Sequence, residues 1–283
     1  MRLQRTIKNP VTLEGRGIHT GSKVKITIKS APPDEGIHFV RKDLKTSSRL
    51  LADVSNLRDY SNKLRCTSLG KGSAGVHTIE HLLAALYGLS VDNADIEIDN
   101  AEPPALDGSA SEYAAAIKMA GSVEQDRKRK ELLLKDIVWE EMRGSFLIAL
   151  PYAGFKISYL LHYSGANLSS EYAEFSFDSE KEKEKIFLDE IAPARTFCLY
   201  KEVFLIKALG LAKGVGLGNA LVIKDGKPIK NKFRLKDEPA RHKILDLLGD
   251  LALLNKDIKA HIIGIKSGHS LNRKLLKKLE RGI

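Results

Sequence analysis

Two short segments far apart in the chain carry side chains that could hold and use one metal ion. The first is Thr78-Ile79-Glu80-His81, and the second is His242-Lys243-Ile244-Leu245-Asp246. A catalytic zinc takes three protein ligands from His, Asp or Glu and keeps a further position open for water. If these residues share one ion, the fold must bring a segment from the first third of the chain against one near its end.

The second segment supplies two of the three ligands. His242 and Asp246 are four residues apart, which places both on one face of a helix. His81 can complete the triad, and Glu80 beside it can take a proton from the attacking water, since successive helix residues point about 100° apart. This combination indicates metal-assisted hydrolysis. Structural alternatives remain for each: a histidine at a helix start is usually structural, and a His–Asp pair at this spacing can simply share a hydrogen bond on an exposed face.

Three further side chains could assist the chemistry. Asp250 lies one turn beyond Asp246 and could orient a histidine or a ligand, or could be a surface acid paired with a lysine. His269, in the glycine-flanked loop 266–270, has a pKa suited to acid–base work near neutrality, although such a loop can also merely turn. Thr196 could donate a hydrogen bond to an oxyanion, in a segment that otherwise looks like an ordinary loop.

Helical spacing and apolar alternation predict helices and strands in both halves of the chain. In the first helix, Thr78 is the predicted N-cap and Gly88 the predicted stop. The expected helices are 77–89, 111–120, 202–211 and 239–254, with a helix start or surface loop at 179–185. The expected strands are 24–28, 37–40, 94–99, 137–139, 146–150, 156–161, 220–223 and 260–265.

The segment 121–130 is polar and charged without an apolar period, and it is the best boundary in the chain. We therefore expect an N-terminal domain over 1–122, a linker over 123–131 and a C-terminal domain over 132–283. The fold class is α+β, with each domain built as a β-sheet layer packed with a pair of helices. The active site is expected at the interface between the two domains.

Charge and composition narrow the classes of partner. The formal net charge of +10 favours anions, including phosphorylated substrates and acidic lipid surfaces. Nucleic-acid binding is not expected, because aromatic residues are only 6% and none interleave with a basic stripe. The apolar stretches are too short to cross a bilayer, the N-terminus lacks the apolar core of a signal peptide, and the two cysteines, Cys66 and Cys198, make no disulfide framework. A cytoplasmic protein is expected.

Six segments, in this order, resemble one family, the UDP-3-O-acyl-N-acetylglucosamine deacetylases, which are zinc enzymes of the committed step in lipid A biosynthesis. They run over nearly the whole chain and are residues 13–21 (LEGRGIHTG), 78–86 (TIEHLLAAL), 107–110 (DGSA), 192–197 (APARTF), 241–246 (RHKILD) and 267–272 (SGHSLN).

The resemblance implies a role for each matching residue. His81, His242 and Asp246 would bind one zinc ion per chain, although iron could substitute in such a site. Glu80 would be the general base, and a charged His269 the general acid or electrostatic stabiliser. The remaining implied roles are Asp250 holding His269, Thr196 stabilising the oxyanion, Lys243 and His19 holding the polar portion of the substrate, and Phe197, Val203 and Ala212 lining an apolar passage for the acyl chain.

The resemblance also implies the reaction and its setting. The substrate would be UDP-3-O-(3-hydroxyacyl)-N-acetylglucosamine, hydrolysed to the free amine and acetate in the cytoplasm of a Gram-negative bacterium. The enzyme would be a monomer with peripheral contact to the inner-membrane surface. Val215 stands where the family usually has glycine, and it is expected to narrow the acyl passage.

Two alternatives to this function stay open on the sequence. One is a zinc hydrolase acting on a different amide or ester at the same site. The other is a basic two-domain binding protein whose histidines are structural, which would bind polyanions in a salt-sensitive way.

Overall fold

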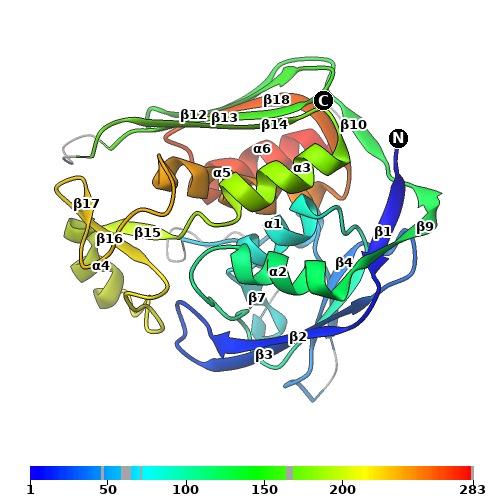
Figure 1. Ribbon diagram of the computed structural model, residues 1–283, viewed down its shortest axis with the longest axis horizontal. Helices are drawn as coiled ribbons and strands as arrows, with labels where there is room; N and C mark the ends of the chain where they lie inside the picture. The colour runs from blue at the N-terminus through cyan, green and yellow to red at the C-terminus, as the bar shows by residue number, and fades with distance from the viewer. Residues whose placement is uncertain (46–47, 59–64, 71, 164–167, 282–283) are drawn as a thin grey trace.

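The computed structural model describes residues 1–45, 48–58, 65–70, 72–163 and 168–281, and it is a mixed α+β structure (Figure 1). Several sheets and six α-helices make up these residues. The helices are α1 (Glu80–Gly88), α2 (Ser111–Ala120), α3 (Glu180–Ile186), α4 (Val203–Ala208), α5 (Glu238–Leu251) and α6 (His269–Glu280).

The N-terminal half is built on a five-stranded sheet. Its strand order is β2 (Val11–Arg16), β3 (Lys23–Ser30), β8 (Ala94–Ile98), β4 (Ile37–Arg41) and β5 (Ser48–Leu51). In β3 every second residue is buried, because successive side chains of a strand point to opposite faces. The buried face, which includes Ile26 and Ile28, packs into the core together with α1 and α2.

The C-terminal half is built on a six-stranded sheet around one long strand, β18 (Asp257–Ile265). The path runs through β11 (Val138–Met142), β12 (Ser145–Pro151), β18, β13 (Phe155–Leu161) and β14 (Glu171–Phe177), while β10 (Glu131–Leu133) pairs with the start of β18 off this path. Helices α3, α5 and α6 lie along one face of this sheet (Figure 1).

Helices α1 and α5 lie against each other at the centre of the molecule, and this contact places the two segments with the candidate metal ligands side by side. All nine residues of α1 and most residues of α5 are buried. The close approach depends on Gly249, since a Cβ at this position would lie 2.1 Å from the backbone oxygen of Glu80. The buried core residues of both halves form one continuous cluster.

Several predicted elements are confirmed, among them the helix at 111–120, the strand predicted over 94–99, which is observed as β8 over 94–98, and the long helix that carries His242 and Asp246. The predicted N-cap is wrong. Thr78 has a φ of +54°, its Oγ1 donates a hydrogen bond to Glu102, and Ile79 precedes the helix instead. The loop predicted around His269 is also wrong, because His269 is the first residue of α6. With α3 and α6 beside α5, the C-terminal sheet has more than the predicted pair of helices.

The polar segment predicted as a linker is extended. Residues Ser122–Lys128 form β9, which pairs antiparallel with β1 (Leu3–Ile7), and β10 follows directly. Most side chains of β9 are exposed, so the strand has no apolar alternation by which the sequence could reveal it. This two-stranded ribbon carries the chain from one half of the molecule to the other (Figure 1).

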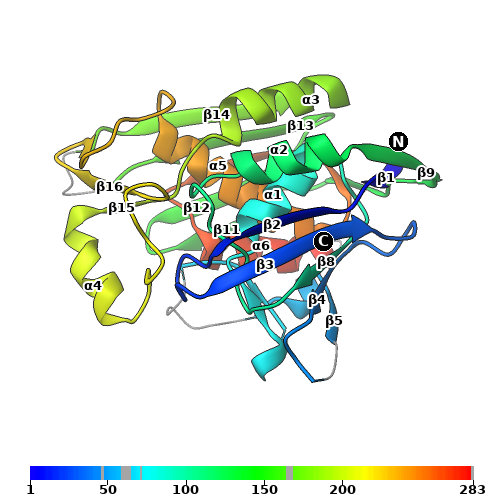
Figure 2. The same ribbon diagram turned by 60° about the horizontal axis from the view of Figure 1, so that its bottom comes forward.

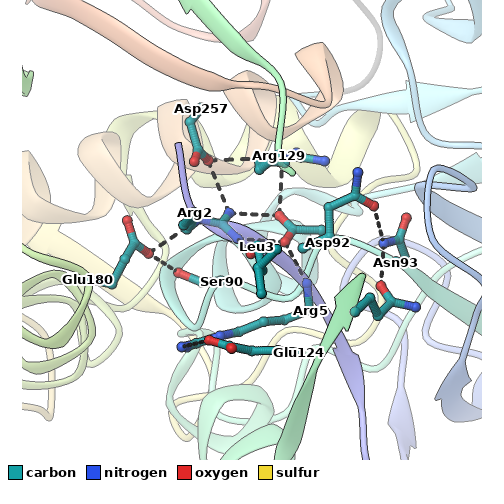
Figure 3. Close-up of polar contacts among 12 residues, drawn as sticks. Arg2, Leu3, Arg5, Ser90, Asp92, Asn93, Glu124, Arg129, Glu180 and Asp257 are labelled. Carbon is teal, nitrogen blue, oxygen red and sulfur yellow. Dashed lines mark hydrogen bonds and ion pairs between the residues drawn. The ribbon is translucent and has the colours of Figure 1, made fainter. Parts of the chain in front are cut away.

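Charged side chains tie the halves together beside this ribbon (Figure 3). Arg2 donates to both carboxylate oxygens of Asp92, at 2.6 and 2.7 Å, and to Asp257 at 3.0 Å. The Nε of Arg129 forms a further ion pair with Asp92 at 3.1 Å. Asp92 precedes β8 and Asp257 begins β18, so the two arginines join strands of different sheets. Removing one partner of such a buried cluster leaves an uncompensated charge, which destabilises a fold strongly.

A small three-stranded sheet stands at the edge of the molecule with α4 beside it (Figure 2). Its order is β15 (Phe197–Leu199), β16 (Leu221–Lys224) and β17 (Lys227–Pro228). None of the helices within the described ranges combines the length and apolar character that a bilayer span requires.

Candidate metal centre and active site

Three side chains from α1 and α5 converge on one point. The Nε2 atoms of His81 and His242 lie 3.7 and 3.4 Å from the same carboxylate oxygen of Asp246. The two imidazole rings meet edge to face, with centroids 5.0 Å apart. The three candidate ligand atoms all lie within 4.8 Å of one another, and all three residues are buried. The structure therefore brings together the triad that the sequence predicted.

Hydrogen bonds fix two of these ligands in place. The Nδ1 of His242 lies 3.0 Å from the backbone oxygen of Ala194, so this nitrogen is the donor and Nε2 is left with its lone pair toward the centre. Lys243 donates to the second carboxylate oxygen of Asp246 at 2.8 Å, which leaves the first oxygen facing the histidines.

The electrostatics of His242 and Asp246 favour the protonation states that bind a cation. Burial lowers the pKa of His242 to about 3, so its imidazole is neutral. Burial by itself raises the pKa of Asp246, but the ammonium of Lys243, with His242 and His269, outweighs it and holds this pKa well below its usual range. Neutral imidazoles and an ionised carboxylate are the forms that ligate zinc. The donor set and its geometry thus fit a zinc ion.

A second cluster surrounds Glu80 and His269. The Nε2 of His269 lies 3.7 Å from Glu80 Oε1 and 3.7 Å from Asp246 Oδ2. Behind the ring, Nδ1 lies 3.0 Å from Asp250, which is fully buried. Burial by itself lowers the pKa of His269, but Asp250, Glu80 and Asp246 overcome it and raise the pKa to about 9. His269 is therefore a cation near neutral pH.

Glu80 is held by the backbone and kept away from solvent. Its Oε2 accepts a hydrogen bond from the backbone N–H of Thr67 at 3.0 Å, which leaves Oε1 on the side of His269. Burial raises the pKa of Glu80 although the nearby imidazoles oppose this. A carboxylate with a raised pKa accepts a proton more readily, as a general base must.

Thr67 and Asn272 complete the cluster, and sequence reasoning missed both. Thr67 donates its hydroxyl to Asp250 and lies 3.1 Å from His269 Nδ1, while Asn272 donates to Asp250 at 2.7 Å. Asn272 belongs to the segment 267–272 that carried the family resemblance, but the sequence did not indicate its hydrogen bond to Asp250. Thr67 stands in a segment without a motif.

A cavity of about 370 Å³ opens in front of the two clusters. Its walls include all but one of the site residues predicted from the sequence: His19, Glu80, His81, Thr196, Phe197, Val203, Ala212, His242, Lys243, Asp246 and His269. The exception is Asp250, which lies behind His269. Away from the charged residues the wall is apolar, and there Val203, Ile206, Leu211, Val215 and Val222 join Phe197. Arg65 and Tyr163 also line the cavity and were not predicted.

Glu102 organises the rim of the cavity. It is buried, and it accepts hydrogen bonds from the backbone N–H groups of His19 and Thr20 and from the Thr78 hydroxyl at 2.8 Å. One carboxylate thereby fixes both the loop that presents His19 and the turn before Glu80. Burial lowers the pKa of His19, so the imidazole ring that lines the cavity is neutral.

A buried ion pair holds the segment that presents Thr196. Both oxygens of Glu238 accept from the guanidinium of Arg195, at 2.8 Å from Nε and 3.2 Å from Nη2. Glu238 also accepts the backbone N–H of Arg195 at 3.0 Å. Because Glu238 begins α5, this pair connects Thr196 and the Ala194 carbonyl to the helix that carries His242.

Comparison with known proteins points to one family. The sequence profile of a family described as UDP-3-O-acyl N-acetylglycosamine deacetylase matches residues 4–281. A protein named UDP-3-O-acyl-N-acetylglucosamine deacetylase from Geobacter sp. (strain M21) is 39% identical, with 99% of this chain and 89% of the relative covered. A protein of the same name from Coxiella burnetii (strain CbuK_Q154) is also 39% identical, with 98% and 89% covered. A protein named bifunctional enzyme LpxC/FabZ from Chlorobaculum tepidum is 37% identical over 98% of this chain, which spans only 64% of that longer relative.

Proposed function

The chain belongs to the UDP-3-O-acyl N-acetylglycosamine deacetylase family, and we propose that its cavity carries out this reaction by a zinc-dependent mechanism. The protein is an enzyme that hydrolyses the N-acetyl group of UDP-3-O-(3-hydroxyacyl)-N-acetylglucosamine, giving UDP-3-O-acyl-glucosamine and acetate, in the biosynthesis of lipid A. The observation that carries the mechanism is the convergence of His81, His242 and Asp246 beside Glu80 and His269.

His81, His242 and Asp246 would hold one zinc ion per chain. When bound, zinc supplies a Lewis acid that polarises the amide carbonyl and lowers the pKa of water from ~15.7 to roughly 7. The chain's own contribution begins with orientation. The Ala194 carbonyl fixes the His242 ring, and Lys243 fixes the Asp246 carboxylate.

Glu80 is the general base. Its Oε1 lies on the side of the cavity where His269 approaches, and its raised pKa matches the removal of a proton from the attacking water. The charged His269, whose Nε2 lies 3.7 Å from Glu80 Oε1, donates its own proton to the leaving amine, and Glu80 then passes the proton that it took from water to the neutral His269. Asp250 lies behind the His269 ring and keeps it protonated, while Thr67 and Asn272 donate hydrogen bonds to Asp250 and hold that carboxylate in place.

Thr196 and Lys243 both line the cavity and contact the substrate there. Thr196 is fixed by its backbone N–H, which donates to the Gly108 carbonyl at 2.8 Å, and its hydroxyl assists the developing oxyanion. Lys243 and His19 line the cavity near its polar end and hold the sugar portion. Burial lowers the pKa of Lys243 by itself, but Asp246 outweighs it and raises this pKa, so the side chain is cationic.

The acyl chain occupies the apolar side of the cavity, against Phe197, Val203 and Ala212. Val215 narrows this passage relative to the glycine usual in the family. Apolar contacts in this passage favour binding of an acylated substrate. The same nucleotide sugar without the acyl chain lacks these contacts and should bind weakly.

The architecture and setting complete the proposal. The halves 1–122 and 132–283 act as two domains, with the site where α1 meets α5. The protein works as a monomer. Its place is the cytoplasm, and the two unpaired cysteines, Cys66 and Cys198, agree with such a reducing compartment.

The test is an acetate-release assay on purified protein. UDP-3-O-(3-hydroxyacyl)-N-acetylglucosamine is supplied after chelation and again after one equivalent of zinc, with UDP-N-acetylglucosamine as the control that lacks the acyl chain. We expect release that disappears with chelation, returns with zinc and stays near background with the control. A folded protein that releases no acetate in any of these states would overturn the proposal.

A further inference from the structure

A small lobe formed by residues 197–232 borders the apolar side of the cavity. It contains the sheet β15–β16–β17 and the helix α4, and it stands at the edge of the molecule in both views (Figures 1 and 2). We call it the α4 lobe. Its inner side chains line the acyl passage, while its outer side chains have no part in the mechanism.

The outer surface of the α4 lobe is unusually apolar. Phe204 is 83% exposed, Leu205 is 56% exposed and Leu209 is 50% exposed. Tyr200 and Leu217, in the same lobe, are about half exposed. Helix α4 faces the cavity with one apolar side and leaves bulky apolar side chains exposed to water on the other. Such an exposed apolar patch is typical of an interaction surface.

This exposed surface is continuous with the cavity wall. Val215 and Leu217 line the cavity and are themselves 37% and 49% exposed. On α4, Val203 and Ile206 face the cavity while Phe204 and Leu205, their neighbours in sequence, face outward. Apolar side chains of the lobe thus lie both on its outer face and on the cavity wall, and Val215 and Leu217 belong to both.

The lobe is also strongly basic. Residues 197–232 include seven lysines and two acidic residues, Glu202 and Asp225. Glu202 forms an ion pair with Arg65 at 2.6 Å, so its carboxylate offsets little of the positive charge of the exposed lysines. The lysines of the lobe, which are Lys201, Lys207, Lys213, Lys224, Lys227, Lys230 and Lys232, are all exposed.

We propose that the α4 lobe is a docking surface for an anionic phospholipid bilayer. Phe204, Leu205 and Leu209 enter the boundary between headgroups and acyl chains, and the surrounding lysines contact the lipid phosphates. This inference rests on the proposed function, because it gives an acylated substrate or product an apolar route between the cavity and the bilayer. A second copy of the chain is the poorer occupant, since two lobes of the same positive charge would repel each other.

The experiment measures binding of the purified protein to sedimented vesicles, without substrate. Vesicles of phosphatidylglycerol and phosphatidylethanolamine are compared with vesicles of phosphatidylcholine, at about 0.1 M salt and again at high salt. We expect binding to the anionic vesicles only, weakened by salt. Phe204→Ser should lower the partition constant by about tenfold or more, and Lys224→Gln with Lys227→Gln by roughly fivefold for each lysine.

The matched control is Trp139→Ser, which removes an aromatic side chain of 56% exposure from β11, on the C-terminal sheet. It should leave vesicle binding unchanged. Equal binding of Phe204→Ser and the parent protein would overturn the proposal, as would loss of binding in Trp139→Ser alone, which would place the docking surface on the sheet. A dimer in solution that Phe204→Ser converts to a monomer, with no vesicle binding, would show that a second copy covers the lobe.

Acetate release in the absence of vesicles separates the two proposals. An active protein that ignores anionic vesicles refutes the docking surface and leaves the proposed function standing. A protein that binds vesicles through Phe204 and releases no acetate supports the surface and refutes the reaction.

Discussion

The buried pair between Arg195 and Glu238 offers a sharp test, because a single-atom change should disturb both the fold and the metal centre. In Glu238→Gln one carboxylate oxygen becomes an amide nitrogen. Each oxygen of Glu238 now accepts two donors: Oε1 from the backbone N–H and the Nε of Arg195, and Oε2 from Arg195 Nη2 and the backbone N–H of Arg234 at 2.6 Å. Whichever oxygen is replaced, two donors would face an amide group that donates.

The expected loss of stability follows from burial. Glu238 is fully buried and Arg195 is 5% exposed. The substitution therefore leaves a guanidinium charge in the interior without its counter-ion, a change that costs about 3–5 kcal/mol. With a urea dependence of about 3 kcal/mol per molar, the unfolding midpoint should fall by about 1 M or more. The measurement is equilibrium urea unfolding of the metal-free protein, followed by circular dichroism.

The same substitution should weaken zinc binding in the folded protein. Arg195 and Glu238 fix the segment whose Ala194 carbonyl orients His242. Loss of such an outer partner typically costs 10–100-fold in metal affinity. A competition titration against a chromophoric chelator, without denaturant, measures this separately from stability.

The control is Glu190→Gln. It removes an exposed partner of Arg241, a residue that lies on α5 like Glu238. Glu190 lies 2.7 Å from Arg241, and its side chain is 48% exposed. An exposed pair contributes at most about 1 kcal/mol, so neither the midpoint nor the zinc affinity should change appreciably. If Glu238→Gln behaves like Glu190→Gln in both measurements, the argument that this pair supports the metal centre is wrong.

Three further predictions follow from the geometry. Glu80→Gln should retain one equivalent of zinc yet lower kcat by about 10²-fold or more, as measured by acetate release and metal content; loss of the zinc itself would argue that Glu80 is a ligand and not the base. Gly249→Ala should destabilise the fold by about 1–3 kcal/mol and reduce kcat, because the new Cβ would lie 2.1 Å from the Glu80 backbone oxygen. Thermal unfolding measures the loss of stability. The control is Gly218→Ala, whose new Cβ would meet no atom within 4 Å. Glu171→Gln should gain stability relative to the parent as the pH rises from 5 to 8. Burial raises the pKa of Glu171 from 4.5 to about 7, so the folded state binds this proton more tightly than the unfolded state, and the parent loses stability through that window. Parallel Tm profiles for the two proteins would contradict this last expectation.

Short-range patterns were sufficient to predict the candidate ligands and most of the central elements. The four-residue spacing of His242 and Asp246 needs only a helix to put both on one face, and the apolar spacing of 239–254 predicts that helix. Strands such as β3 and β8, half buried and alternating, were likewise visible. These features are local, so the sequence determines them without knowledge of the rest of the chain.

Elements whose stability comes from distant partners were missed. Strand β9 is exposed along most of its length and is held by its pairing with β1, more than a hundred residues earlier. Helix α6 begins at His269 after a glycine in extended conformation, so the start of the helix looks like a loop in the sequence. Thr78, predicted as a cap, is drawn instead into a hydrogen bond with Glu102 that no local rule anticipates.

The sequence by itself therefore predicted the chemistry of the centre, as three candidate metal ligands, a candidate base and a histidine in the order typical of the family. The tertiary structure alone decided how they act. It brings α1 against α5 through Gly249, buries Glu80 so that its pKa rises, and places Asp250, Thr67 and Asn272 behind His269. Desolvation and the fields of neighbouring charges depend on which atoms meet in space, and the order of residues along the chain does not specify those meetings.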